Sequence, residues 1–154
     1  MDRISYHEMF MNIAKEVSKR STCCRKQVGS ILISDKKKII SCGWNGVPSG
    51  KKHCADFFSL EEKNKDEFYK IHGEWSKYNE LHSELNCIIH CDRDLLKTAT
   101  LYTTLSPCSE CAKIIIASEI PNVIYLELYD RDQTGIEILK KNGVEIFQVN
   151  SSLV

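Results

Sequence analysis

The sequence predicts an α/β protein in which helices cover both faces of one sheet. Five short runs rich in β-branched and aromatic residues alternate with stretches whose apolar residues have helical spacing. A chain of 154 residues with zero formal net charge has the size of one domain with one hydrophobic core. We therefore expect a single domain spanning residues 1–154, built in three α/β/α layers.

The first part of the chain is expected to form a helix, a hairpin and an irregular insertion. Apolar residues recur at helical spacing from Ile4 to Lys19, which predicts a helix that covers the core. Residues 28–33 and 39–44 are typical of two strands, and the charged turn between them makes a hairpin. Residues 51–80 are rich in Lys and Glu. They predict an insertion within the domain, formed by a loop and then a mostly exposed helix.

The remainder of the chain alternates helices and strands. We expect strands at residues 100–105, 123–128 and 144–149. One helix is expected to begin at His82 and another near Pro107. A third helix is expected to span Thr134–Lys141, with Gly143 as its C-terminal cap. Ligands of such sheets bind beyond the strand ends. The loop at residues 43–50 and the first two of these helix starts should therefore meet there.

Two short motifs carry the chemistry of the sequence. They are His82-Ser83-Glu84 and Pro107-Cys108-Ser109-Glu110-Cys111. A catalytic zinc ion takes three protein ligands and keeps a fourth position for water, and one His and two Cys supply three. Glu84 is then a carboxylate beside the metal that can move protons during hydrolysis. Together the motifs match the signature of zinc deaminases that act on nucleobases.

Both motifs are expected to open helices. Pro107 suits the first turn of a helix, where a missing N–H is harmless. Cys108 and Cys111 would lie in that turn, where unpaired N–H groups favour thiolates and residues three apart can face one metal. A lone Cys-x-x-Cys could be a redox pair or half of a structural zinc site, and a lone His-x-Glu can occur by chance. Their combination favours a catalytic zinc.

Composition excludes several classes of partner. The 21 basic and 21 acidic residues balance, whereas proteins that bind long nucleic acids usually carry a basic face. We therefore expect no nucleic-acid partner. The sequence contains no apolar run long enough to cross a membrane, and Met1–Glu8 lacks the apolar centre of a signal peptide. We expect a cytoplasmic protein, in the host cytoplasm if the chain is viral, whose eight Cys serve as thiols and metal ligands.

The chain resembles the deoxycytidylate (dCMP) deaminases encoded by tailed phages and other large DNA viruses. The resemblance covers nearly the whole sequence and is carried by residues 27–29, 43–50, 74–86 and 105–113. Two positions depart from the usual family pattern, because Ser83 and Trp44 replace Ala and Tyr. The resemblance implies the cytidine deaminase fold, with a five-stranded mixed sheet. It also implies zinc-dependent conversion of dCMP to dUMP, which supplies thymidylate synthesis.

Residues that hold the nucleotide are less clearly marked than the metal ligands. Asn45 should bind the deoxyribose, because its amide can both donate and accept hydrogen bonds. The phosphate needs cations near the pocket mouth, and Arg25 and Lys26 are the nearest candidates. The alternative is that both are solvated loop charges. Tyr129, after the fourth strand, either covers the ligand or lies at the edge of the core.

Four further residues predict a second, structural zinc site. They are Cys23, Cys54, His72 and Glu80, and they match a second zinc site in the phage-type enzymes. Such a set needs no water ligand, and a metal would hold down an insertion with little apolar surface. His53 is a substitute ligand. The alternative is that the two Cys are buried thiols while His72 and Glu80 are solvated.

The resemblance also implies regulation and assembly. Related enzymes are oligomers, often hexamers, activated by dCTP with Mg²⁺ and inhibited by dTTP. Arg93, expected at the end of the His82 helix, is implied to lie near subunit contacts and the effector site. The alternative is an arginine that only complements the helix dipole.

Two other functions stay open at this point. The same chemistry could act on a base in tRNA or single-stranded DNA, although the chain lacks a basic stripe with interleaved aromatic residues. A zinc-stabilised binding module without activity is the second alternative. Glu84 argues against that module, because a purely structural site does not need its carboxylate.

Overall fold

A five-stranded mixed sheet forms the centre of the protein, with the strand order β2-β1-β3-β4-β5. The structure is a computed structural model that describes residues 3–58 and 65–149. Strand β1 pairs antiparallel with β2 and β3, while β3, β4 and β5 are parallel. The strands are β1 (Gly29–Ile33), β2 (Ile39–Trp44), β3 (Thr100–Leu105), β4 (Asn122–Glu127) and β5 (Glu145–Gln148).

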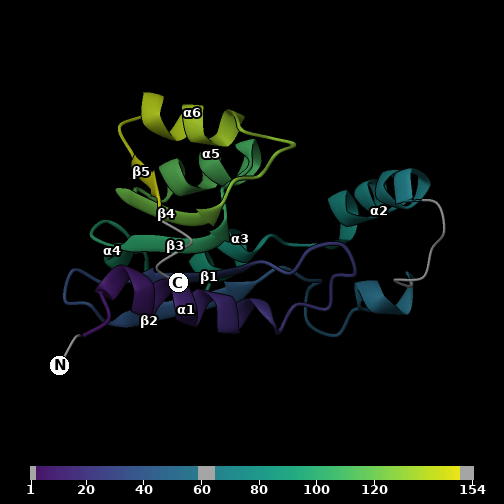
Figure 1. The fold of residues 1–154 in the computed structure, drawn as a ribbon, viewed down its shortest axis with the longest axis horizontal. Helices are drawn as coiled ribbons and strands as arrows, with labels where there is room; N and C mark the ends of the chain where they lie inside the picture. The colour runs from purple at the N-terminus through teal and green to yellow at the C-terminus, as the bar shows by residue number, and fades with distance from the viewer. Residues whose placement is uncertain (1–2, 59–64, 150–154) are drawn as a thin grey trace.

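Helices lie on both faces of this sheet. They are α1 (Tyr6–Ser18), α2 (Lys65–Asn79), α3 (Ser83–Ile88), α4 (Arg93–Leu96), α5 (Ser109–Ala117) and α6 (Thr134–Lys141), and Cys54–Asp56 forms the 3₁₀ helix η1. Figure 1 shows α1 on the side of the sheet that faces the viewer. Its buried residues Phe10 and Met11 join one core cluster with Ile31 of β1. Leu32, the next residue of β1, joins the opposite cluster with residues of α3, α5 and α6.

The alternation of side chains along β1 explains this arrangement. Successive residues of a strand point to opposite faces. All five residues of β1 are buried, because helices cover both faces of this central strand. The predicted α/β/α class and the five-stranded mixed sheet are therefore confirmed, as is the hairpin of β1 and β2.

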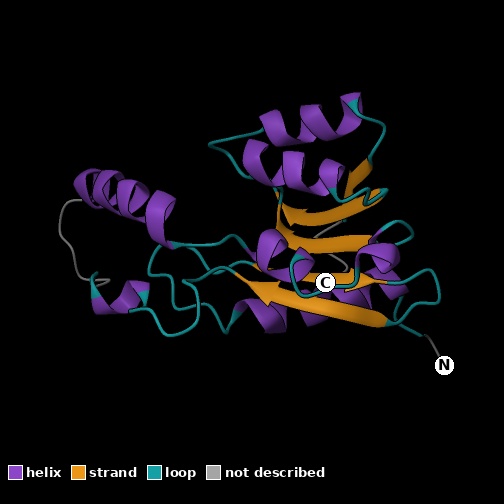
Figure 2. Ribbon diagram, turned by 180° about the vertical axis from the view of Figure 1, so that it is seen from behind, coloured by secondary structure: helices purple, strands orange, loops and turns teal. Residues whose placement is uncertain are grey.

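The insertion forms an arm that contains the predicted exposed helix and also two buried side chains. We call η1 and α2 the arm, and both views show it to one side of the sheet, apart from the other helices (Figures 1 and 2). Helix α2 is mostly exposed, as predicted, but Phe68 and His72 are buried. Rings of Phe58, Phe68 and Trp75 lie against the His72 imidazole. The arm thus has its own small core around a histidine. The charged residues 61–63 lie outside the described residues.

Helix ends refine other predictions. Helix α3 ends at Ile88 and is followed by α4, a short helix that the apolar pattern did not predict. Gly143 follows α6 with a φ of 77°, which confirms the predicted cap. Among the described residues, no helix combines the length and the apolar character required to cross a membrane.

Candidate active site and metal centres

The two sequence motifs meet at the starts of two helices. His82 is the N-cap of α3, Cys108 is the N-cap of α5, and Cys111 lies in the first turn of α5. His82 Nδ1 lies 3.5 Å from Cys108 Sγ and 3.3 Å from Cys111 Sγ. Tetrahedral zinc, with bonds of about 2.3 Å to sulfur and about 2.0 Å to nitrogen, would separate such atoms by about 3.5 Å. The donor set and its spacing therefore fit a zinc ion.

Neighbouring segments hold this cluster in place. Pro107 precedes the N-cap of α5, so it lies just before the first turn in which it was predicted. A Cβ on Gly135 would lie 2.1 Å from the Pro107 carbonyl oxygen, which shows that α6 rests directly on this backbone. The Asp132 carboxylate accepts a hydrogen bond of 2.8 Å from the Ser109 N–H. That bond, with others from Thr134, lowers the pKa of Asp132 to about 2.

The electrostatics of the cluster suit metal binding and proton transfer. Hydrogen bonds from Cys111 and His82 lower the pKa of Cys108, which favours the thiolate form that binds zinc. Glu84 lies in the first turn of α3 and is buried, and burial raises the pKa of its carboxyl group. A raised pKa suits a carboxylate that must both take and give a proton near neutral pH.

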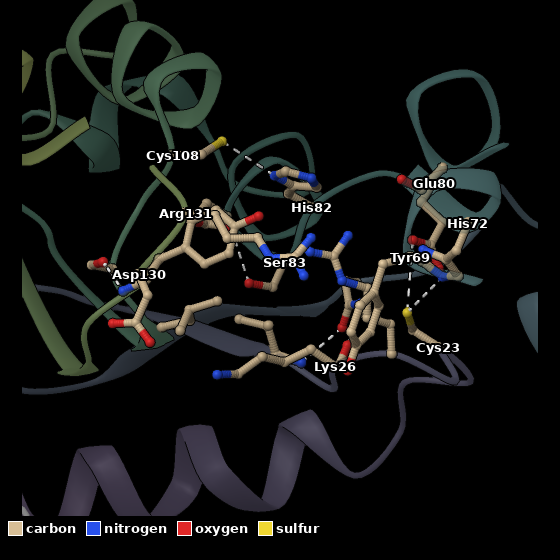
Figure 3. A pocket seen from close by; sticks show the side chains of 18 of the residues that line it. Cys23, Lys26, Tyr69, His72, Glu80, His82, Ser83, Cys108, Asp130 and Arg131 are labelled. Atoms are coloured by element: carbon tan, nitrogen blue, oxygen red, sulfur yellow. Dashed lines mark hydrogen bonds between the residues drawn. The ribbon is translucent and has the colours of Figure 1, made fainter. Parts of the chain in front are cut away.

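The four residues predicted to hold a second metal also converge. Figure 3 shows Cys23, His72 and Glu80 close together. His72 Nε2 lies 3.4 Å from Cys23 Sγ and 3.3 Å from Cys54 Sγ. Glu80 Oε2 lies 3.8 Å from Cys23 Sγ. His53 is not part of the cluster, because its exposed ring contacts Thr22 Oγ1 at 3.1 Å. The structure thus brings together the predicted set and excludes the substitute ligand.

Burial of this second cluster calls for a compensating charge. Cys23, Cys54 and His72 are buried, which contradicts the alternative of a solvated His72. Burial raises the pKa of both thiols and of Glu80 and lowers that of His72, so each group is pushed toward its neutral form. Glu80 Oε1 is buried and has no hydrogen-bond partner in the described part of the chain. A divalent cation would satisfy that oxygen and stabilise two thiolates, so a zinc ion fits.

A cavity of about 310 Å³ lies beside both clusters. Its lining includes His82, Glu84 and Cys108 of the first cluster and Cys23, His72 and Glu80 of the second. The loop after β2 closes one side, because Gly46 and Leu81 exchange two backbone hydrogen bonds of 3.0 and 2.8 Å. This pairing confirms that the loop at residues 43–50 and the two helix starts meet beyond the strand ends.

The predicted nucleotide-binding residues all line this cavity, but two of them are already engaged. The Asn45 amide accepts a hydrogen bond from Val28 N–H at 2.7 Å and donates to the Lys26 carbonyl at 2.9 Å. Lys26 Nζ forms an ion pair of 3.0 Å with Glu127. Asn45 therefore stabilises the backbone at Lys26 and Val28 beside the cavity. The ion pair with Glu127 makes Lys26 less available for a phosphate. Tyr129 borders the cavity, and its N–H donates to Ser106 Oγ at 2.8 Å.

Sequence reasoning missed two residues of the cavity, Arg131 and Tyr69. The guanidinium carbons of Arg25 and Arg131 lie 5.3 and 4.7 Å from the centre of the Tyr69 ring. Figure 3 shows Arg131 and Tyr69 side by side in the pocket. In the described part of the chain no carboxylate forms an ion pair with either arginine. Arg131 follows the end of β4, and ligands of such sheets bind beyond the strand ends, so its position in the sequence could have indicated a binding residue.

Arg93 does not lie where the sequence predicted. It is the first residue of α4, after the N-cap Asp92, and not at the end of the His82 helix. Its side chain is 75% exposed and lies 3.8 Å from Glu119. Because α4 has only four residues, Arg93 also belongs to its last turn, so the helix-dipole alternative stays a prediction.

The fold and the first cluster together define a class of metal-dependent hydrolytic enzyme. Three zinc-type ligands leave a coordination position open beside a buried carboxylate, at the edge of an α/β/α sheet. The sequence model of the cytidine and deoxycytidylate deaminase zinc-binding region matches residues 4–127. The chain therefore belongs to the cytidine and deoxycytidylate deaminase family.

Relatives and solved structures agree with this assignment. The deoxycytidylate deaminase of Enterobacteria phage T4 is 36% identical, with 90% of this chain and 87% of that protein covered. ComE operon protein 2 of Bacillus subtilis is 34% identical, covering 97% of this chain and 74% of that protein. The crystal structure of dCMP deaminase from cyanophage S-TIM5 in complex with dCMP and dUMP has a TM-score of 0.72 and 28% identity. The match covers 97% of this chain and all of that chain.

Proposed function

We propose that this protein is a zinc-dependent dCMP deaminase, which converts dCMP and water to dUMP and ammonia. The observation that carries the proposal is one cavity lined by His82, Cys108 and Glu84 and also by Arg25 and Arg131. The relatives support the choice of substrate, because the T4 protein is a deoxycytidylate deaminase and the cyanophage enzyme was crystallised with dCMP and dUMP.

Chemistry at the first cluster would follow from its residues. His82, Cys108 and Cys111 would hold zinc, which when bound lowers the pKa of a water in the open fourth position. Glu84 would take a proton from the attacking water and pass it to N3 of cytosine as the new C–O bond forms at C4. Glu84 would then carry the second water proton to the amino group, which leaves as ammonia.

Selection of a nucleotide over a nucleoside would come from the two arginines. A phosphate monoester offers oxygens that guanidinium groups bind in charge-assisted pairs. Arg25 and Arg131 approach the cavity from different segments and share the Tyr69 ring, which holds both near one place. Lys26, paired with Glu127, would contribute less. Asn45 and Tyr129 remain the proposed contacts for the sugar and the base.

We further propose that Cys23, Cys54, His72 and Glu80 hold a structural zinc that fastens the arm to the rest of the protein. The buried Glu80 oxygen, which has no hydrogen-bond partner among the described residues, supports this role. We also propose that the protein is a homo-oligomer, with a hexamer favoured. It would be activated by dCTP with Mg²⁺ and inhibited by dTTP. Its product dUMP would supply thymidylate synthesis. Arg93, exposed on α4, would contribute to subunit or effector contacts. The single domain and the cytoplasmic location stay predictions.

A panel of substrates tests the central claim. The zinc-loaded protein is incubated separately with dCMP, dCTP, cytidine and a tRNA anticodon stem, and each reaction is analysed for a uracil or inosine product. We expect the highest kcat/KM for dCMP. Equal values for dCMP and cytidine would remove the nucleotide assignment, and product from the tRNA stem alone would favour a nucleic-acid enzyme.

A further inference from the structure

A line of three buried side chains connects the sheet to Glu84. Ser83 Oγ donates a hydrogen bond of 3.1 Å to Glu84 Oε2, and Ser30 Oγ lies 2.7 Å from Ser83 Oγ. Ser30 and Ser83 are fully buried, and Glu84 is 5% exposed. Two hydroxyl groups therefore lie behind the carboxylate, in a region where water does not compete for them.

The chemistry of the three groups sets the direction of these bonds. An ionised carboxylate only accepts hydrogen bonds, so the Ser83 hydroxyl hydrogen must go to Glu84. Ser83 Oγ is then free to accept, and the Ser30 hydroxyl donates to it. When Glu84 carries a proton, the Ser83 hydroxyl can rotate, because it can also accept. The Ser30 and Ser83 hydroxyl groups can therefore form hydrogen bonds with both the ionised and the protonated form of Glu84.

Close packing of α3 on the sheet places Ser83 over Ser30. Gly43 of β2 is the cross-strand partner of Ser30. A Cβ on Gly43 would lie 2.5 Å from Cys87 N and 2.6 Å from the Ser83 carbonyl oxygen, so no side chain fits between β2 and α3. The Ser30 hydroxyl is itself on β1, an inner strand whose five residues are all buried. The hydroxyl pair therefore ties Glu84 to the most enclosed part of the sheet.

We propose that Ser83, supported by Ser30, is a positioning residue that holds Glu84 Oε2 and leaves Oε1 as the oxygen that exchanges protons with water and substrate. This inference rests on the proposed function in that it takes Glu84 to be the proton shuttle. A carboxylate held at one oxygen keeps a single orientation through the reaction. Ser83 acts through Glu84 and does not itself touch the reacting atoms.

The test compares Ser30→Ala, Ser83→Ala and the double variant, with Ser41→Ala as a matched control. Ser41 Oγ also bonds the sheet to α3, through the Cys87 carbonyl at 2.7 Å, but has no contact with Glu84. Ser30→Ala and Ser83→Ala each leave the other serine hydroxyl buried without its partner, and each should lower Tm by about 2 to 8 °C. The double variant removes both hydroxyls and should recover the part of the loss that comes from an unpaired hydroxyl, but not the part that comes from the lost bond to Glu84.

Turnover should follow a different order from stability. Ser83→Ala and the double variant should lower kcat for dCMP about five- to thirtyfold with little change in KM, because the bond to Glu84 is absent in both. Ser30→Ala should lower kcat less, and Ser41→Ala should leave it unchanged. If kcat instead recovers with Tm in the double variant, or Ser83→Ala turns over dCMP normally, the positioning role is overturned and the pair is only structural.

An infrared measurement makes the test independent of the substrate. The difference spectrum between the wild type and Glu84→Gln isolates the Glu84 carboxyl band. Ser83→Ala should shift that band and Ser41→Ala should not, and an unshifted band in Ser83→Ala would overturn the inference. If Ser83→Ala shifts the band but the wild type leaves dCMP unchanged, the proposed function is contradicted and the hydrogen bond to Glu84 is not.

Discussion

Replacement of Cys54 by Ser should remove one of two zinc ions and loosen the arm. A serine hydroxyl is a poor zinc ligand, whereas the native thiol lies 3.3 Å from His72 Nε2 inside the cluster. The aromatic rings around His72 and the two arginines packed on Tyr69 are further described contacts of α2. Elemental analysis should therefore find two zinc ions per wild-type chain and one in Cys54→Ser, with the His82 cluster still loaded.

The size of the effect follows from binding linkage. A metal present at a thousandfold its dissociation constant stabilises the folded form by about 4 kcal/mol. If the arm opens locally, amide hydrogens of α2 should exchange up to about a thousandfold faster in Cys54→Ser, because each 1.4 kcal/mol is about a factor of ten. Amides of β3 and α5, which belong to the sheet and its cover, should keep their protection.

The neighbouring cysteine provides the control for this experiment. Cys24 directly follows Cys23 in the chain, and its thiol donates to the Phe58 carbonyl at 3.3 Å, outside the metal cluster. Cys24→Ser should keep two zinc ions and normal exchange. A single zinc ion in wild-type protein purified without chelator, or two ions in Cys54→Ser, would refute the second site.

Three further predictions concern catalysis, substrate choice and regulation. Glu84→Gln should keep both zinc ions and the fold but lose about 10²–10⁴-fold in kcat, because an amide cannot carry protons; near-normal turnover by the zinc-loaded variant would disprove the proton-shuttle role. Arg131→Ala should lower kcat/KM for dCMP about 10- to 100-fold and leave cytidine unaffected, since only the nucleotide has a phosphate to pair, and Lys26→Ala should have a smaller effect because Lys26 is paired with Glu127. Equal losses for dCMP and cytidine would place Arg131 outside phosphate recognition. Arg93→Glu should lower the oligomeric state and blunt dCTP activation, and it should cost little monomer stability because the pair with Glu119 is exposed; unchanged sedimentation and an unchanged dCTP response would show that Arg93 has no such role.

Local sequence was sufficient for the secondary structure and for the first metal cluster. Apolar periodicity predicts strands such as Thr100–Leu105, because each pattern depends on neighbours within one element. The spacing of Cys108 and Cys111 brings both sulfurs to one helix start for the same reason. Apolar periodicity did not predict the short helix α4, because four residues are too few to show a helical period.

Tertiary structure alone decided which charged and polar groups serve the cavity. Lys26 precedes its partner Glu127 by a hundred and one positions in the sequence, and only the folded sheet brings the two together. Arg131 joins Arg25 because both pack on Tyr69 of the arm. The same holds for Ser30 beneath Ser83. A sequence indicates which residue types are available and how they repeat along one element, but the partner of a side chain depends on packing between elements distant in the chain.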